Sequence, residues 1–232
     1  MNRINFQFLL LIFIWGLIPD SESTAQIIQK SLSGTIVIPL KSSTLGVRSR
    51  GNAYRSRYGL KKETKQDEKT NPFDDIIVYL SPIDEKPELQ PILPKPQLNQ
   101  KNQTFVPRVL AITKGTTVEI INEDKIYHNV FSYSRIQSFN IGKRPTGVVY
   151  DQTFDNSGAI QVFCNIHPNM SSYVLVLETP YFVKPDDEGY YVFNNIPSGK
   201  YWLEIFHPEF GTEKRQITIK NGTPQSVDIT LR

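Results

Sequence analysis

Residues 161–170 read QVFCNIHPNM, and they hold the only cysteine of the sequence, Cys164. His167 follows three residues later, and Met170 follows three residues after His167. Because the strand-like run AIQVFCN leads into this segment, all three side chains are expected to come from one short loop after a strand. A thiolate, imidazoles and a weakly bound thioether are the donors of blue-copper sites. The segment therefore predicts a copper site that needs one further histidine.

The further histidine is predicted to be His128, in the strand-like run YHNVFSY. The sequence has three histidines, and two of them, His128 and His167, fall where such a site requires them. Zinc is a weaker alternative, since structural zinc sites rarely use methionine and the sequence offers no second cysteine. The other alternative is a sandwich without metal, in which Cys164 is an inert core residue.

The middle of the chain resembles a cupredoxin of the plastocyanin, amicyanin and pseudoazurin kind. The runs that carry the resemblance are FVPRVLAITKGTTVEIINED, HNVFS, SGAIQVFCNIHPNM and YVLVLE, between about residues 104 and 178. The short Cys-x2-His-x2-Met loop is similar to that of amicyanin. The resemblance implies a Greek-key sandwich that binds one mononuclear type 1 copper through His128, Cys164, His167 and Met170.

The resemblance also implies roles for the neighbours of these ligands. Asn129 would tie the two ligand loops together, and His167 would be the electron port, surrounded by Pro168, Ile166 and Tyr127. The stretch SYSRIQSFNIGKRPTG departs from small electron carriers and is similar to cupredoxin-like proteins associated with methylamine utilisation. The implied partner is a redox protein, such as a c-type cytochrome or an oxidase, whose identity this departure leaves open.

The end of the chain resembles a carboxypeptidase regulatory-like, transthyretin-like sandwich. The resemblance is carried by DDEGYYVFNNIPSGKYWLEIFHPEFGTEKRQITI and the final QSVDITL. Such sandwiches open with two further strands, and the runs SGTIVIPL and DIIVYL near the N-terminus fit them. We therefore expect an all-β protein in which the cupredoxin interrupts the smaller sandwich. The expected division is 26–81 for the first strands and a basic loop, 82–98 for a Pro-rich linker, 99–179 for the inserted cupredoxin and 180–232 for the remainder.

The N-terminus predicts export. Residues 1–25 contain the apolar run FLLLIFIWGLI followed by SESTA, which is typical of a cleaved signal peptide and predicts a mature chain from Gln26. The apolar run is short for a membrane span of about 20 residues, although an uncleaved anchor is the alternative, and no later segment is apolar enough to span. The predicted location is periplasmic or secreted. A lone cysteine there cannot form an internal disulfide, and metal binding would protect its thiolate from oxidation.

Composition narrows the function. A net charge of +3 gives no case for a nucleic-acid partner. A multicopper oxidase or nitrite reductase would need more histidines to bind additional coppers. With His128 and His167 assigned to the metal site, few side chains remain that could act as the general base of a hydrolase. The sequence therefore predicts an electron carrier that is not an enzyme. The alternative is an envelope binding or structural module in which copper is structural, stored or delivered to another protein.

Two further features stay open at the level of sequence. The stretch 41–69 carries nine Lys or Arg against three Asp or Glu. It is either a docking segment for an acidic partner or anionic surface, or a solvated loop. His207, in FHPEF, is either another ligand or partner contact, or a histidine at the end of a strand, and the second interpretation is favoured because no Cys, Met or second His is nearby.

Overall fold

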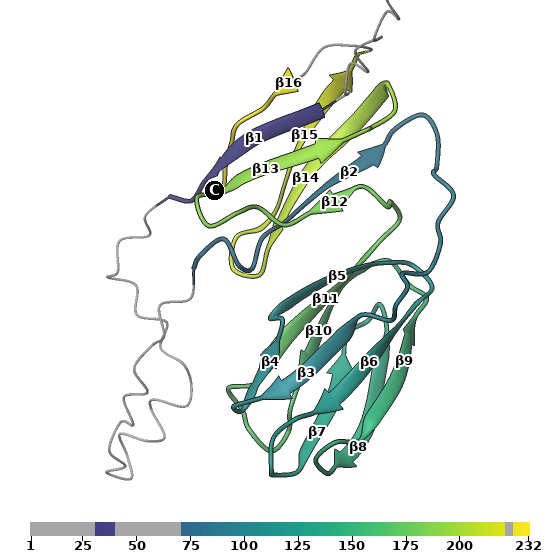
Figure 1. Ribbon diagram of the computed structural model, residues 1–232, viewed down its shortest axis with the longest axis vertical. Helices are drawn as coiled ribbons and strands as arrows, with labels where there is room; N and C mark the ends of the chain where they lie inside the picture. The colour runs from purple at the N-terminus through teal and green to yellow at the C-terminus, as the bar shows by residue number, and fades with distance from the viewer. Residues whose placement is uncertain (1–30, 40–70, 221–224) are drawn as a thin grey trace, which may run out of the picture.

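The computed structural model describes residues 31–39, 71–220 and 225–232. The predicted signal peptide and the basic stretch 41–69 lie outside the described residues. Every regular element in the described part of the chain is a β-strand, which confirms the predicted all-β fold. Within that part, no helix is long and apolar enough to cross a membrane. Figure 1 shows two bodies of strands, one built from the middle of the chain and one from its two ends.

The middle of the chain forms a sandwich of two sheets, which we call the central sandwich. One sheet has the order β5-β11-β10-β7-β8, and the other has the order β4-β3-β6-β9. The strands are β3 (Gln97–Lys101), β4 (Thr104–Val106), β5 (Val109–Thr113), β6 (Thr116–Asn122), β7 (His128–Tyr133), β8 (Ser138–Arg144), β9 (Val149–Phe154), β10 (Gly158–Phe163) and β11 (Ser171–Leu177).

Alternation of side chains explains how these strands form a two-layer core. In β6, TTVEIIN, every second residue is buried, including Val118 and Ile120. Residues two apart point to the same face of a strand, so one face of β6 packs inward while the other meets solvent. The core between the two sheets also contains Leu98, Val130, Ile160, Cys164, Met170 and Val174. The sulfur side chains predicted to bind metal are therefore part of a packed interior.

The two ends of the chain form a second sandwich, which we call the split sandwich. One sheet has the order β12-β2-β14-β15; in the other, β1 lies between β13 and β16 and also pairs with β17. The strands are β1 (Ser31–Val37), β2 (Ile77–Pro82), β12 (Phe182–Val183), β13 (Tyr190–Asn194), β14 (Gly199–His207), β15 (Gly211–Ile219), β16 (Gln225–Ser226) and β17 (Ile229–Thr230).

The pairing of β1 and β2 bears on the domain division. Both strands precede the central sandwich in the chain, yet β1 pairs with β13 and β2 pairs with β14, which follow it. The core of the split sandwich likewise joins Leu32 and Val78 to Tyr191 and Leu203. This topology supports an insertion of the central sandwich, although the domain boundaries themselves stay a prediction. Strand β3 begins at Gln97, within the segment predicted to be a Pro-rich linker.

A third apolar cluster joins the two sandwiches. Ile77, Tyr79 and Phe206 come from the split sandwich, while Val109, Leu175 and Leu177 come from the central sandwich. The rings of Tyr173 and Phe206 meet edge-on, with centroids 5.8 Å apart. At one side of this cluster Arg108 forms ion pairs with Asp75 and Glu209. The interface explains why Phe206 is buried although the alternation of β14 places it on the outward face of its sheet.

Candidate metal site

The site is assembled from one strand start and one hairpin loop. His128 is the first residue of β7, and Cys164 follows β10 directly. The loop that returns to β11 is tight, since the Cys164 N–H donates to the Met170 carbonyl at 3.3 Å and the Met170 N–H donates to the His167 carbonyl at 3.0 Å. The predicted loop between two strands is therefore present, and it carries Cys164, His167 and Met170 at one end of the central sandwich.

Three of the four predicted ligands converge. The Sγ atom of Cys164 lies 3.7 Å from Nδ1 of His128 and 3.9 Å from Nδ1 of His167. The two Nδ1 atoms lie 3.1 Å apart. Among the described residues, these three form a group of possible metal donors whose ligating atoms all lie within 4.8 Å of one another. His128 and Cys164 are buried, and His167 is partly exposed.

These separations fit a single small metal ion. Bonds of about 2.0 Å to nitrogen and about 2.3 Å to sulfur, at trigonal angles, separate two nitrogens by roughly 3.5 Å and a nitrogen from a sulfur by roughly 3.7 Å. The nitrogen–sulfur distances agree with that estimate, and the nitrogen–nitrogen distance is a few tenths of an ångström shorter. One thiol with two imidazoles is the donor set that suits copper, and the carboxylate and carbonyl oxygens that magnesium or calcium prefer are absent from this group.

Met170 lies beside this group in the interior. Its side chain is almost fully buried and belongs to the same apolar cluster as Cys164. The backbone bonds to His167 and Cys164 hold Met170 at the base of the loop. A thioether is the weak axial donor of type 1 copper sites, and the ligand role of Met170 stays a prediction.

A carboxylate that the sequence analysis did not single out contacts the site. The Nε2 atom of His128 lies 2.8 Å from Oδ2 of Asp124, four residues earlier in the chain. The Asp124 carboxylate also accepts the backbone N–H groups of Asn102 and Gln103, at 2.6 and 2.9 Å. In the sequence, Asp124 lies in the run NEDK between two strands, where an acidic residue is expected in a turn. Only its spacing of four from His128 could have signalled the contact.

The charge state of Asp124 follows from these contacts. Burial opposes ionisation of the carboxyl group, but the N–H of Gln103, the His128 imidazole and the N–H of Asn102 together outweigh it, so the pKa of Asp124 lies below its ordinary value. An ionised carboxylate is acceptor-only, which matches three donors pointing at its two oxygens.

The predicted surface and supporting residues surround His167 and His128. The side chains of Tyr127 and Ile166 are exposed, at 59% and 39%, and Pro168 is exposed as well. Asn129 is buried next to His128, and its Oδ1 atom has no hydrogen-bond partner among the described residues. The role predicted for Asn129, a tie between the two ligand loops, stays a prediction.

The third histidine lies in the split sandwich. His207 ends β14 and is buried, and its Nδ1 atom accepts the backbone N–H of Glu209 at 3.0 Å. Its ring also packs against Phe210. His207 therefore stabilises the turn into β15, which agrees with the interpretation of a histidine at the end of a strand.

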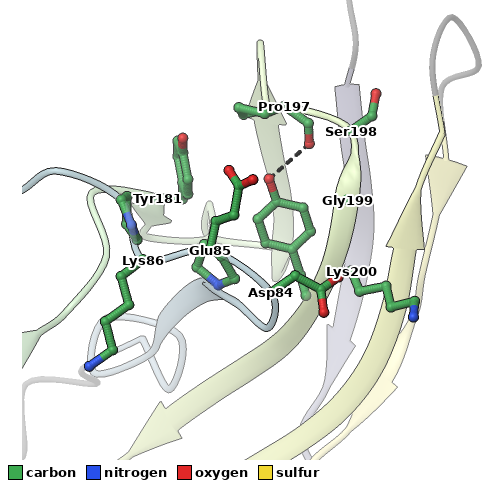
Figure 2. Close-up of a pocket in the computed structure, with 11 residues that line it drawn as sticks. Asp84, Glu85, Lys86, Tyr181, Pro197, Ser198, Gly199 and Lys200 are labelled. Atoms are coloured by element: carbon green, nitrogen blue, oxygen red, sulfur yellow. Dashed lines mark hydrogen bonds between the residues drawn. The ribbon is translucent and has the colours of Figure 1, made fainter.

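A surface pocket of the split sandwich is separate from the candidate metal site. Figure 2 shows Tyr181 and Glu85 at this pocket, which Tyr201 also lines. The Tyr201 hydroxyl donates to the Pro197 carbonyl at 2.8 Å. Asp84 and Lys200 also line the pocket, which contains neither histidine nor cysteine. The lining carries side chains of both charges but no thiol or imidazole. The pocket is therefore not an extension of the cluster around Cys164.

Comparison with known families supports one part of the predicted organisation. Residues 171–232 match the model of the carboxypeptidase regulatory-like domain. This match confirms the resemblance proposed for the end of the chain. It begins at β11 and covers β12 to β17, whereas β1 and β2 lie outside it. No curated protein matches the chain.

Several solved structures are similar to the chain. A reduced amicyanin variant is 21% identical, with 37% of this chain and 85% of that chain covered and a TM-score of 0.35. A purple cupredoxin from Nitrosopumilus maritimus is 25% identical, covers 36% of this chain and 100% of its own, and has a TM-score of 0.33. A copper-containing nitrite reductase from Thermus scotoductus is 28% identical over 43% of this chain and 26% of its own, with a TM-score of 0.36.

Proposed function

We propose that the chain binds one type 1 copper through His128, Cys164 and His167, with Met170 as the axial ligand, and carries single electrons between redox proteins. The observation that carries the proposal is the convergence of one thiol and two imidazoles, with all ligating atoms within 4.8 Å. A copper ion bound there would supply a one-electron couple between Cu(II) and Cu(I).

The chain's own part in this function is to keep the donors in place. His128 is anchored at the start of β7, and the loop of Cys164, His167 and Met170 is closed by its own backbone bonds. The loop is flanked by the pair of Phe163 and Ser171, which is the first pair of the regular antiparallel ladder between β10 and β11. Donors on such a scaffold rearrange little when the charge of the ion changes, which favours rapid electron exchange.

The partly exposed His167 is the proposed route for the electron. Tyr127, Ile166 and Pro168 give its surroundings an exposed, largely apolar character. A surface of this kind can approach a redox partner closely while excluding water. We infer a redox protein as the partner and, from the N-terminal segment, a protein that is exported and cleaved after residue 25.

Voltammetry of the copper-loaded protein tests this proposal. The expected result is one copper per chain and a reversible one-electron wave, with metal content measured on the same sample. Cys164→Ala is the matched control and should show no such wave. Copper that binds tightly without a reversible wave would contradict electron transfer and favour storage or delivery. A protein that retains no copper would contradict the proposed metal site itself.

A further inference from the structure

We propose that Asp124 is a positioning residue: it holds the His128 imidazole with the proton on Nε2, so that the bare Nδ1 faces Cys164 and His167. This inference rests on the proposed copper site for its functional meaning. Its structural part concerns the protein before any metal binds, and that part can be tested separately.

The contacts of the two ring nitrogens carry the first step. Nε2 of His128 lies 2.8 Å from Oδ2 of Asp124, while Nδ1 lies 3.7 Å from the Cys164 sulfur. Both oxygens of Asp124 already accept backbone N–H groups, from Asn102 and Gln103, so the carboxylate acts as the acceptor and the imidazole donates in this bond. A neutral imidazole carries one proton, and placing it on Nε2 leaves the lone pair of Nδ1 free for a metal ion.

The second step is that Asp124 itself cannot turn away. Its two oxygens accept the N–H groups of Asn102 and Gln103, two consecutive residues with φ of 54° and 58° in the turn between β3 and β4. The Asp124 N–H donates to Oδ1 of Asn122 at 3.0 Å, and its carbonyl accepts the Thr146 hydroxyl. The side chain of Asp124 is only 14% exposed. The turn between β3 and β4 is thereby linked through one carboxylate to the ring of His128.

The third step concerns charge. Partners on the far nitrogen of a metal-binding histidine fix its tautomer and raise its basicity. A carboxylate at this place also puts a negative charge near the ion, and this charge stabilises Cu(II) more than Cu(I). Asp124 is therefore expected to lower the reduction potential as well as to orient the ring.

Asp124→Asn separates these effects from simple packing. The amide has nearly the same shape but only one acceptor oxygen, whereas three N–H donors point at the carboxylate. Some of these donors must lose their partner, and His128 can then accept from the amide through Nε2. Asp155→Asn is the matched control. It removes the same charge from an exposed residue of the same sandwich, beyond the far end of β10 and roughly 20 Å of strand from Cys164.

The experiment is long-range proton–nitrogen NMR of the histidine rings in the metal-free full chain, at a pH of about 8, above the ordinary imidazole pKa. The wild type and Asp155→Asn should show His128 protonated at Nε2. Asp124→Asn should show a mixture of both tautomers. The inference is overturned if wild-type His128 carries its proton on Nδ1, or if Asp124→Asn leaves the tautomer unchanged.

A second measurement uses the copper-loaded protein. Asp124→Asn should raise the reduction potential, and Asp155→Asn should leave it close to that of the wild type. Equal potentials in all three proteins would overturn the electrostatic part of the inference. The NMR measurement reads the His128 tautomer without metal, so its result stays valid even if the protein does not bind copper or carry electrons. Failure of the proposed copper site can therefore be distinguished from failure of the role proposed for Asp124. Circular dichroism of each variant checks that the sandwich has folded.

Discussion

The Nδ1 atoms of His128 and His167 lie 3.1 Å apart, although 39 positions of sequence separate the two residues. The start of β7 and the loop after β10 meet at the same end of the central sandwich, with the sulfur of Cys164 beside them. Two imidazoles held so close in a partly buried place need either a shared proton or a shared ion. The thiol next to them favours the ion.

Cys164→Ser tests the thiolate as a ligand. The hydroxyl is a much poorer donor for Cu(II), so the visible thiolate-to-copper band should disappear. Cys164 is buried, and a buried hydroxyl without a hydrogen-bond partner costs about 1–3 kcal/mol, so the loss of stability should stay within that range. Absorption spectra and far-ultraviolet circular dichroism measure the two effects. A band that persists in the variant would exclude Cys164 as the ligand.

Met170→Leu tests the axial position. Leu and Met have similar volumes, so this buried site should lose less than about 1.5 kcal/mol. Copper should still bind through the other three residues, but Cu(II) would lose a weak donor and the reduction potential should rise. Voltammetry measures the change. An unaltered potential would mean that another group fills the axial position.

The split sandwich should not fold from its C-terminal part alone. A fragment of residues 181–232 lacks β1, which lies between β13 and β16, and β2, which lies between β12 and β14. It also lacks Leu32, Val78 and other core residues from those strands. We expect an unfolded peptide by circular dichroism.

The matched control for that fragment is a chain in which a short Gly/Ser linker replaces residues 99–179. It keeps β1 and β2 and should therefore unfold cooperatively with denaturant. A cooperative transition in the isolated fragment would show that the two sandwiches are simply consecutive.

Tyr79 should make the protein less stable at alkaline pH. Burial, followed by the charge of Glu204, raises the pKa of the Tyr79 phenol above its ordinary value. In the unfolded chain the phenol ionises near pH 10. Above that pH the folded state keeps a proton that the unfolded state has lost, so the free energy of unfolding falls as the pH rises.

Tyr79→Phe should make this alkaline decline shallower, as measured by denaturant unfolding between about pH 9 and pH 11. Part of the decline should remain, because burial also raises the pKa of Tyr191 and Tyr201. Tyr133→Phe, at an exposed residue, is the control. Identical pH dependence in the wild type and Tyr79→Phe would contradict the assignment.

Much of the fold follows from local sequence patterns. Alternation predicts strands such as β6 and β14, and turn residues mark their ends, because side chains of a half-buried strand alternate between core and solvent. The boundaries are less accurate. The run SGTIVIPL predicts a strand at 33–40, whereas β1 spans Ser31–Val37. That shift is set by pairing with β13, which a local pattern cannot contain.

The sequence singles out the candidate donors of the site but not the residues that support them. Cys164, His167 and Met170 stand out by spacing, and His128 by the scarcity of histidine. Asp124 does not, because its role depends on the turn at Asn102 and Gln103 reaching it from another strand pair. The burial of Phe206 could not be predicted from the sequence either, because it results from contact between the two sandwiches.

The most direct test of the central claim is an optical and electron-spin-resonance spectrum of the mature protein after one equivalent of Cu(II). Copper bound by His128, Cys164 and His167 predicts an intense blue band with a narrow copper hyperfine splitting, and both should be lost on reduction and restored on reoxidation. A pale spectrum typical of tetragonal Cu(II) with nitrogen and oxygen ligands would contradict the account.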